Sequence, residues 1–424
     1  MREVHRRHMN NQDSKTKVDR TAIANEVHAL YKETQKDPQQ LTSSEGDEDG
    51  SNIHTSTRQP SCSCINAAHT AALCKQEASQ KVEIRSLNHD QLTYELTSMG
   101  EPAFRVKQIE AWLWQKNARS FDDMTNLSKK LRARLKEKFA LYSPALVSKQ
   151  VSQDGSRKYL LRFQDGVMAE CVGMPTKNKL AICVSTQAGC AIGCVFCATG
   201  KAGLTRSLTG YEIYEQALFI QDDFQMRVAS AVLMGQGEPL TNYNASIFAL
   251  KMMNSASGLG VGARHLTIST CGILPNIIKF SHEKEQFTLA VSLHSAVQST
   301  RDYLMPGVKR FNLQHLHDTM NLYVEATGRR PTYEYALIKG VNDTDEELAA
   351  LCDFCAGTLA HVNLIQLNKI DDSPFLPTSE KRAEHFVKTL KRFGVEATIR
   401  HSRGADIDAA CGQLKQKVVG KKRV

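Results

Sequence analysis

Three cysteines near the middle of the chain have the spacing of a metal-cluster motif. Cys190, Cys194 and Cys197 follow the pattern C-x3-C-x2-C, without a fourth cysteine in the same spacing. Iron–sulfur clusters are normally held by four cysteine thiolates. A set of three therefore predicts a four-iron cluster in which one iron stays open to a substrate or a cofactor. A zinc-binding loop, or three unrelated loop cysteines, is the alternative interpretation.

The elements that must position these cysteines are short β-rich runs that alternate with helical stretches. Six such runs are predicted as strands, at 181–185, 229–234, 265–269, 287–292, 333–337 and 361–367. Strands joined by crossover helices form a parallel sheet, which predicts an α/β fold: an incomplete (β/α)6 barrel or an open sheet. Loops at the carboxyl ends of such strands carry function.

The candidate site residues fall at those strand ends. The three cysteines follow the first strand, and Cys183 lies seven residues before them within it. The other candidates follow strands two, three, four and six: Gly237, Glu238, Ser269, Ser292, Leu293, His294 and Asn368. Because the ends of parallel strands meet at one edge, we expect these side chains to share one site.

The flanking regions divide the chain into further parts. Residues 1–82 are polar, include an acidic run at 43–51, and are expected to be disordered. Residues 83–147 predict a small helical domain whose last segment, 124–138, carries basic residues between leucines, either as a solvated face or as a phosphate-binding face. Residues 148–178 predict a β-hairpin linker, 179–414 the barrel, and 415–424 a basic tail.

The N-terminal extension also carries Cys62, Cys64, His69 and Cys74. Their spacing matches no strong zinc pattern, so we interpret them as solvent-exposed thiols. Cys352 and Cys355 look like a redox C-x2-C pair, but they fall in a helical run and are interpreted as core residues. Cys171 and Cys271 receive the same interpretation.

Composition indicates a soluble protein of the cytoplasm. The 424 residues contain no apolar run of membrane-spanning length, and the first residues lack the apolar centre of a signal peptide. Twelve cysteines in a reducing compartment point to metal ligands or catalysts more than to disulfides. The net charge of +9 is consistent with an RNA-binding face.

Together these motifs resemble the radical S-adenosylmethionine RNA adenine methyltransferases, the RlmN and Cfr family, and RlmN most closely. The resemblance covers about residues 83–414. Its matched segments are Met124–Lys129, Glu170, Cys183–Cys190, Met234–Leu240, Ser269–Gly272, Ser292–His294, Val341–Asp343, Asn368 and Ala410–Leu414.

The resemblance implies a cofactor set and its ligands. Cys190, Cys194 and Cys197 would hold one [4Fe-4S] cluster, whose open iron is chelated by S-adenosylmethionine. Gly237, Glu238, Ser269, Ser292, Leu293, His294 and Asn368 would bind that cofactor. Two molecules are used in each turnover, an electron donor such as flavodoxin reduces the cluster, and the substrates are 23S ribosomal RNA and transfer RNA. The protein is expected to act as a monomer.

The resemblance also implies three catalytic residues. Cys411 takes a methyl group from one cofactor molecule, and the radical made from a second removes a hydrogen atom from it. The resulting carbon radical adds to the adenine ring and links protein to RNA. Cys183 then attacks the sulfur of Cys411, which forms a disulfide and frees the methylated base. Glu170 accepts the ring proton.

Several alternatives stay open at this point. A Cfr-type activity would methylate carbon 8 of adenine in place of carbon 2. An RNA-binding protein with a structural zinc, or a radical enzyme acting on a small molecule or a protein, would need neither Cys183 nor Cys411. From the residues alone, Cys183 is also a plausible core residue of a strand, and Glu170 a solvated residue of a hairpin.

Overall fold

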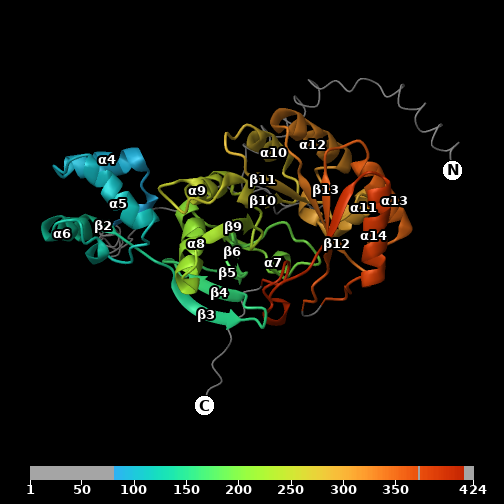
Figure 1. Ribbon diagram of the computed structural model, residues 1–424, viewed down its shortest axis with the longest axis horizontal. Helices are drawn as coiled ribbons and strands as arrows, with labels where there is room; N and C mark the ends of the chain where they lie inside the picture. Colours follow the sequence, from blue (N-terminus) through green and yellow to red (C-terminus); the bar gives the residue numbers. More distant parts are fainter. Residues whose placement is uncertain (1–80, 371–372, 415–424) are drawn as a thin grey trace, which may run out of the picture.

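The computed structural model describes residues 81–370 and 373–414. They form a lobe of helices beside a large curved sheet that is covered by helices on its outer face (Figure 1). The predicted disordered extension, its cysteines and histidine, and the predicted basic tail lie outside the described residues, apart from Lys81 and Val82. No helix among the described residues is long and apolar enough to cross a membrane.

The helical lobe is made from the chain between the extension and the sheet. It contains β1 (Val82–Glu83), α4 (His89–Ser98), α5 (Phe104–Trp114), α6 (Lys129–Lys138) and β2 (Phe139–Ala140), with β1 paired in parallel to β2. Asn88 begins α4 with a capping box, and Ser128 caps α6 through the peptide nitrogen of Leu131. The apolar residues of these helices form the core of the lobe.

The first residue of α5 is not in that core. Phe104 opens α5 and is 55% exposed, whereas Val106, Ile109 and Leu113 are buried. The Arg105 guanidinium lies over the exposed Phe104 ring. The buried apolar stripe of α5 therefore begins at Val106.

A buried arginine joins the lobe to the sheet region. Arg85 is 1% exposed and forms an ion pair with Glu215 of α8 (Gly210–Phe224). It also donates to the carbonyl oxygens of Tyr142 and Ala118, at 2.9 and 2.8 Å. Buried charges are tolerated only when they are paired and hydrogen-bonded, so this network fixes the lobe against α8.

The large sheet has ten strands in the order β14-β13-β12-β11-β10-β9-β6-β5-β4-β3. The six predicted parallel strands are β6 (Leu180–Cys183), β9 (Val228–Leu233), β10 (Leu266–Thr270), β11 (Thr288–Ser292), β12 (Thr332–Leu337) and β13 (His361–Gln366). β14 (Glu396–Arg400) pairs in parallel with β13 and adds a further edge strand. The α/β fold with an incomplete barrel is confirmed.

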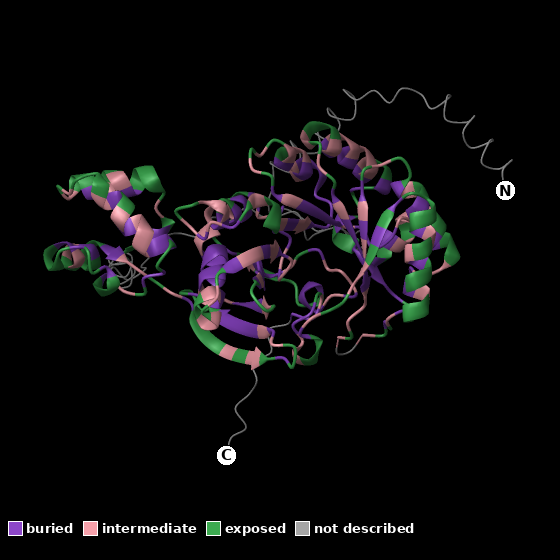
Figure 2. Ribbon diagram, viewed as in Figure 1, coloured by how far each residue is buried: buried purple, intermediate pink, exposed green. Residues whose placement is uncertain are grey.

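Helices cover the outer face of these strands, as Figure 1 shows. Besides α8, they are α9 (Tyr243–Asn254), α10 (Leu274–Ser281), α11 (Gln298–Leu304), α12 (Leu313–Thr327), α13 (Asp345–Cys355) and α14 (Glu380–Arg392). Figure 2 shows the strands buried and the outward helix faces exposed. Cys352 and Cys355 are buried in α13, where the prediction placed them in the core.

An antiparallel extension continues the sheet beyond β6. β4 (Arg157–Arg162) and β5 (Met168–Pro175) form the predicted hairpin, and β5 pairs with β6. β3 (Ala145–Val151), which the sequence did not predict, pairs with β4 at the edge. The register sets Val172 opposite both Lys158 and Cys183, so these three side chains lie on one face of the extension.

A C-terminal segment, residues 401–414, crosses that face and returns to the barrel. Its apolar residues Ala409 and Leu414 pack on Val172, with Cys183 and Ile407 at the edge of the cluster. The carboxylate of Asp154 accepts from the peptide nitrogen of Gly404 at 3.1 Å. The segment therefore connects the antiparallel extension with the open end of the barrel.

Candidate active site

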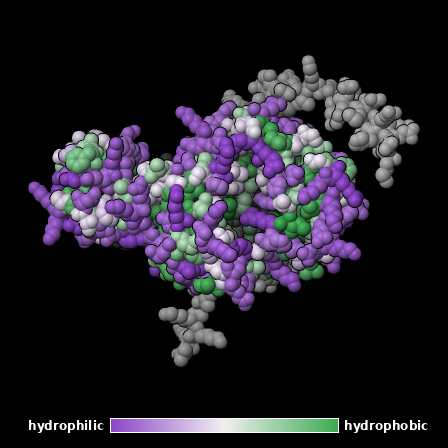
Figure 3. Space-filling model, viewed as in Figure 1, coloured by the Kyte–Doolittle hydropathy of each residue, from purple (hydrophilic) through white to green (hydrophobic). Residues whose placement is uncertain are grey.

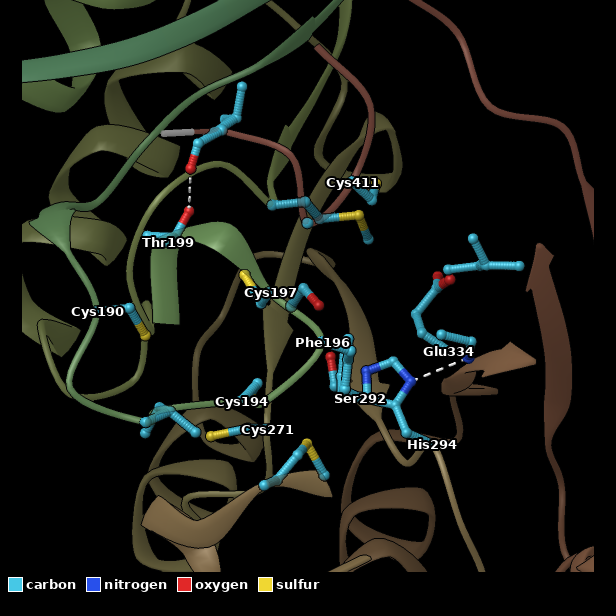
Figure 4. A pocket seen from close by; sticks show the side chains of 18 of the residues that line it. Cys190, Cys194, Phe196, Cys197, Thr199, Cys271, Ser292, His294, Glu334 and Cys411 are labelled. Atoms are coloured by element: carbon cyan, nitrogen blue, oxygen red, sulfur yellow. Dashed lines mark hydrogen bonds between the residues drawn. The ribbon is translucent and has the colours of Figure 1, made fainter. Parts of the chain in front are cut away.

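A cavity of about 170 Å³ lies at the carboxyl ends of the barrel strands. Most of the predicted site residues line it: Cys190, Cys194, Cys197, Gly237, Glu238, Ser269, Ser292, His294, Asn368 and Cys411 (Figure 4). Figure 3 shows the corresponding hollow in the barrel face, with hydrophobic residues around it. Leu293, Cys183 and Glu170 are not among the lining residues.

The three-cysteine loop lies between the short strand β7 (Gln187–Gly189) and the short helix α7 (Ala198–Lys201). β7 pairs with β8 (Leu204–Ser207), and the peptide nitrogen of Cys190 donates to the carbonyl of Gly203 at 2.8 Å. A Cβ on Gly200 would lie 2.8 Å from the peptide nitrogen of Cys194. Glycine is therefore required where α7 closes over the loop.

The three thiols face the same end of the cavity. Burial raises the pKa of Cys190 to about 12 and that of Cys194 well above its ordinary value, and the neighbouring cysteines add to both effects. Without a metal the thiols of Cys190 and Cys194 are neutral, and a bound metal would replace their protons. Among the described residues, no group of three or more Cys, His, Asp or Glu is arranged to hold a single metal ion.

This geometry disfavours the zinc alternative, since a structural zinc needs four ligands converging on one atom. Three cysteines that line the same cavity suit a larger group such as a [4Fe-4S] cluster with one iron free. The residues present therefore fit the cluster.

Glu238 provides a fixed carboxylate next to this wall. Its two oxygens accept from the peptide nitrogens of Leu240 at 2.9 Å and Cys271 at 2.7 Å. Burial raises the pKa of Glu238, and these hydrogen bonds oppose that effect. Gly237 has a φ of +100°, and a Cβ there would lie 2.6 Å from the side chain of Gln187. The carboxylate is thus placed to accept an ammonium group.

His294 forms the opposite wall with Ser292. Its backbone is left-handed, with a φ of +56°, and its Nδ1 accepts from the peptide nitrogen of Ala336 at 3.0 Å. Burial, together with the nearby Arg301, lowers the pKa of His294 to about 3. The neutral ring then carries its proton on Nε2, which Figure 4 shows on the side of Phe196 and Ser292. Phe196 packs edge-on against this ring at 4.9 Å.

Arg301 organises the loops behind this wall, and the sequence did not single it out. It is 2% exposed and donates to the carbonyls of Ser292 at 2.9 Å, Leu293 at 2.5 Å and Cys271 at 2.7 Å. Burial lowers its pKa to about 10. The Leu293 side chain is fully buried in the core, so only its backbone is near the cavity.

Cys271 is both a core residue and part of the cavity wall. It is buried, as predicted, but it also lines the cavity and lies close to Glu238 and Cys194. Burial, followed by the Glu238 charge, raises the pKa of its thiol well above the ordinary value. Its thiol is therefore neutral and a poor nucleophile.

Cys411 is brought to the cavity by the C-terminal segment. The Asn368 amide donates to the Cys411 carbonyl at 3.1 Å, and the peptide nitrogen of Ala198 donates to the carbonyl oxygen of Gly412 at 2.8 Å. Thr199 of α7 donates to the carbonyl of Leu414 at 2.7 Å, which Figure 4 also shows. These bonds hold Cys411 beside the three-cysteine loop.

The two predicted catalytic cysteines interact electrostatically. Although the Cys411 residue is exposed, its thiol lies within the cavity wall, where loss of solvation raises its pKa and Arg400 opposes the increase. Burial raises the pKa of Cys183 to about 12, and a negative charge on Cys411 adds to it. Both are free thiols, and each is favoured as a thiolate by the Arg400 guanidinium.

Arg400 and Glu334 line the same cavity and were missed by the sequence reasoning. Arg400 Nη1 lies 3.8 Å from Glu334 Oε2 and 3.5 Å from the sulfur of Met234. Glu334 Oε1 accepts from the Asn363 amide at 3.2 Å. The sequence carried a weak signal for both residues. Each is a charged residue within a strand pattern, Glu334 in β12 and Arg400 in β14, and a strand places every second side chain on the same face.

Glu170 lies on β5, on the face that carries Cys183, and it is 2% exposed. The solvated alternative for this residue is therefore wrong. Its Oε1 lies 3.5 Å from Lys158 Nζ. The structure buries this carboxylate beneath the C-terminal segment rather than in the cavity wall.

The basic face of α6 is largely neutralised within the lobe. Lys136 pairs with Asp122, Lys138 with Glu95, and Arg134 with Glu101 at 3.1 Å. Within the described part of the chain, no ion pair is formed by Lys129 and Lys130. Only the first turn of α6 thus offers uncompensated charge to a phosphate.

The fold and the site define the class first: this is a radical S-adenosylmethionine methyltransferase. Residues 184–354 match the profile of the radical SAM superfamily, and residues 82–141 match that of the ribosomal RNA large subunit methyltransferase N-terminal domain. A crystal structure of a radical SAM methyltransferase from Sphaerobacter thermophilus is similar, with a TM-score of 0.76 and 39% identity, covering 79% of this chain and all of that one.

The particular family follows from curated relatives. The chain is 44% identical over 324 residues to the probable dual-specificity RNA methyltransferase RlmN of Clostridium perfringens, covering 76% of this chain and 93% of that protein. It is 42% identical over 346 residues to that of Bacillus subtilis, covering 81% and 95%. The chain belongs to the RlmN family, which confirms the resemblance seen in the sequence.

Proposed function

We propose that this protein methylates carbon 2 of an adenosine in 23S ribosomal RNA and in transfer RNAs, with Cys411 as the methyl carrier. One observation carries the proposal: the C-terminal segment places Cys411 in the same cavity as Cys190, Cys194, Cys197 and Glu238. A radical enzyme with another kind of substrate has no need of a thiol at that position. The dual-specificity RNA methyltransferases named RlmN, to which the chain is similar, supply the substrate class.

When bound, the [4Fe-4S] cluster and two molecules of S-adenosylmethionine per turnover supply a methyl group and a 5'-deoxyadenosyl radical. Glu238 would accept hydrogen bonds from the ammonium group of the cofactor. Ser269, Ser292, His294 and Asn368 border the remaining space and orient the rest of it. Ser292 and the neutral His294 both bring hydrogen-bond donors to the cavity, and no charge is added at that wall.

The protein's own residues divide the reaction between them. Cys411 accepts the methyl group on its sulfur as a thiolate, and the methyl carbon, after loss of one hydrogen atom, bonds to carbon 2 of adenine. Glu170 would accept the proton from that ring carbon as the ring radical gives up one electron, which the cluster, when bound, would take back. Cys183 attacks the sulfur of Cys411 and forms a disulfide as the bond between carbon and sulfur breaks. The released carbon keeps the electron pair and takes a proton from solvent, which gives the methyl group of the free base.

The target adenosine must leave its stack to reach this cavity, so base extrusion is part of the proposal. An electron donor such as flavodoxin starts the radical step, and the enzyme acts as a monomer in the cytoplasm. Lys129 and Lys130 on the lobe are positioned to contact phosphates by charge.

The test is product identification. Anaerobically reconstituted protein is incubated with S-adenosylmethionine, a reductant and either 23S ribosomal RNA or transfer RNA, and the digested nucleosides are compared with 2-methyladenosine and 8-methyladenosine by chromatography and mass spectrometry. We expect 2-methyladenosine, and none from the Cys411→Ala variant. Formation of 8-methyladenosine, or undiminished product from that variant, contradicts the proposal.

A further inference from the structure

A buried lysine connects the predicted proton acceptor with the segment that carries the methyl carrier. Lys158 on β4 is 6% exposed, and lysine is almost never buried to this extent without partners. Its Nζ lies 3.5 Å from Glu170 Oε1 and donates to the carbonyl of Asp408 at 3.2 Å. Asp408 is three residues before Cys411 in the sequence.

The strand register explains why one side chain reaches both partners. Lys158 lies opposite Val172 on β5, and Glu170 is the next residue of β5 on the same face. Ala409 and Leu414 of the C-terminal segment pack on Val172. The ammonium group is therefore enclosed between the sheet and the segment, with the carboxylate on one side and a peptide carbonyl on the other.

The backbone at Asp408 is held in an uncommon conformation. Its φ is +53°, a left-handed value that residues other than glycine rarely adopt. Such a conformation persists when the surrounding contacts favour it. The hydrogen bond from Lys158 to the Asp408 carbonyl is one of these contacts. It fixes the orientation of the Asp408 carbonyl, and therefore the direction in which the backbone continues to Cys411.

We propose that Lys158 is a positioning residue for the methylation reaction. Its ammonium group contacts both the Glu170 carboxylate and the segment that carries Cys411, and so fixes the position of one relative to the other. The ion pair orients the Glu170 carboxylate, which has no place in the cavity wall. The second contact fixes the segment on the same ammonium group. This inference rests on the proposed function, because it acts through the roles assigned there to Glu170 and Cys411.

Two measurements separate this role from general stabilisation. The variants are Lys158→Met, which keeps the length of the side chain and removes the charge, and Lys158→Arg, which keeps the charge. Lys149→Met is the control for loss of a lysine ion pair, since Lys149 on the neighbouring strand β3 pairs with Asp223 at 2.7 Å in a more exposed position. Cluster content and circular dichroism show that each variant folds.

The first measurement does not need turnover. Alkylation of Cys183 by iodoacetamide, followed on its own peptide, reports how often the segment leaves its site, because this half-buried thiol packs against Ala409 and Leu414 of the segment. A hydrogen bond and an ion pair involving a charged group predict an increase of about ten- to a hundredfold in Lys158→Met. Lys158→Arg and Lys149→Met should react like the parent protein. Equal alkylation of Cys183 in the parent and in Lys158→Met would overturn the proposed link to the segment.

The second measurement is a double-mutant cycle on methylation of RNA. If Lys158 acts partly through Glu170, Lys158→Met should reduce turnover about tenfold or more in the parent and by a clearly smaller factor in a Glu170→Gln background, where only its contact with the segment remains to be lost. Losses that multiply in the double variant would overturn the link to Glu170. A parent protein that makes no methylated adenosine contradicts the proposed function instead, and the alkylation result still decides the link between Lys158 and the segment.

Discussion

His294 is predicted to make the stability of the protein depend on pH. The folded protein lowers the pKa of this histidine from 6.5 to about 3, mainly because the ring is buried. Between these two values the unfolded chain binds a proton that the folded protein does not, so stability falls as the pH is lowered below 6.5. The difference between the pKa values limits the total effect to about 5 kcal/mol.

The magnitude over an accessible range follows from the same values. Between pH 7 and pH 5, protonation of His294 in the unfolded chain lowers the free energy of unfolding by about 2 kcal/mol. That is a large part of the 5–15 kcal/mol that stabilises a typical domain. In His294→Gln, which cannot be protonated, this contribution is absent, and the free energy of unfolding should vary less over the interval by the same amount.

The assay is urea unfolding of the cluster-free protein under reducing conditions at pH 7, 6 and 5. Other titrating groups contribute equally to parent and variant, so they cancel in the difference between the two pH dependences. His385→Gln on the exposed face of α14 serves as the control and should keep the pH dependence of the parent. If His294→Gln and the parent lose the same free energy between pH 7 and pH 5, the reasoning is refuted.

Three further predictions concern the cluster, the lobe and RNA binding. Cys194→Ser should lower the iron content below the roughly four atoms per chain of one cluster and abolish the brown colour, which iron analysis and absorption spectra measure. Arg85→Met should cost about 3–5 kcal/mol, because it leaves the Glu215 carboxylate buried without its cation; denaturant unfolding and proteolysis of the lobe report this loss. Replacement of Lys129 and Lys130 by alanine should remove two phosphate contacts with RNA. The slope of log affinity against log salt concentration should then become shallower by nearly two.

Each of these predictions has a control and a contradicting result. Cys352→Ser in α13 should keep the full iron content, and an unchanged content in Cys194→Ser argues against the three-cysteine ligand set. Arg119→Met, which removes an exposed ion pair with Asp222, should cost less than about 1 kcal/mol, and an equally small loss in Arg85→Met contradicts the role of that pair. Lys388→Ala on α14 should leave the salt slope unchanged.

The sequence predicted the parts of this protein whose signals are local. Each parallel strand is a short apolar run, and each predicted cofactor residue follows directly at its carboxyl end, so strand order alone brought Glu238, Ser269, Ser292 and Asn368 to one cavity. The three-cysteine loop was readable because its spacing is short. The resemblance to RlmN added Cys411, whose distance from the other residues hides any local signal.

The residues that the sequence did not reveal depend on contacts between distant elements. Arg400 reaches the cavity because β14 pairs with β13 as the edge strand of the sheet. Lys158 contacts the C-terminal segment because residues 401–414 pass over the antiparallel extension. Neither contact leaves a periodic pattern in the chain. β3 was missed for a local reason: its residues are mostly exposed, with Leu146, Val147 and Val151 facing solvent at the sheet edge.

The path of the C-terminal segment sets an order for the making of this enzyme. Every strand of the sheet and the whole three-cysteine loop leave the ribosome before Cys411, which follows Cys183 by 228 positions. Until the segment docks, nothing in it covers α7 or the face of β5 and β6, so the cluster loop faces solvent while the barrel is already complete. The barrel strands and the three-cysteine loop are therefore able to fold before Cys411, the proposed methyl carrier, is available to reach the cavity.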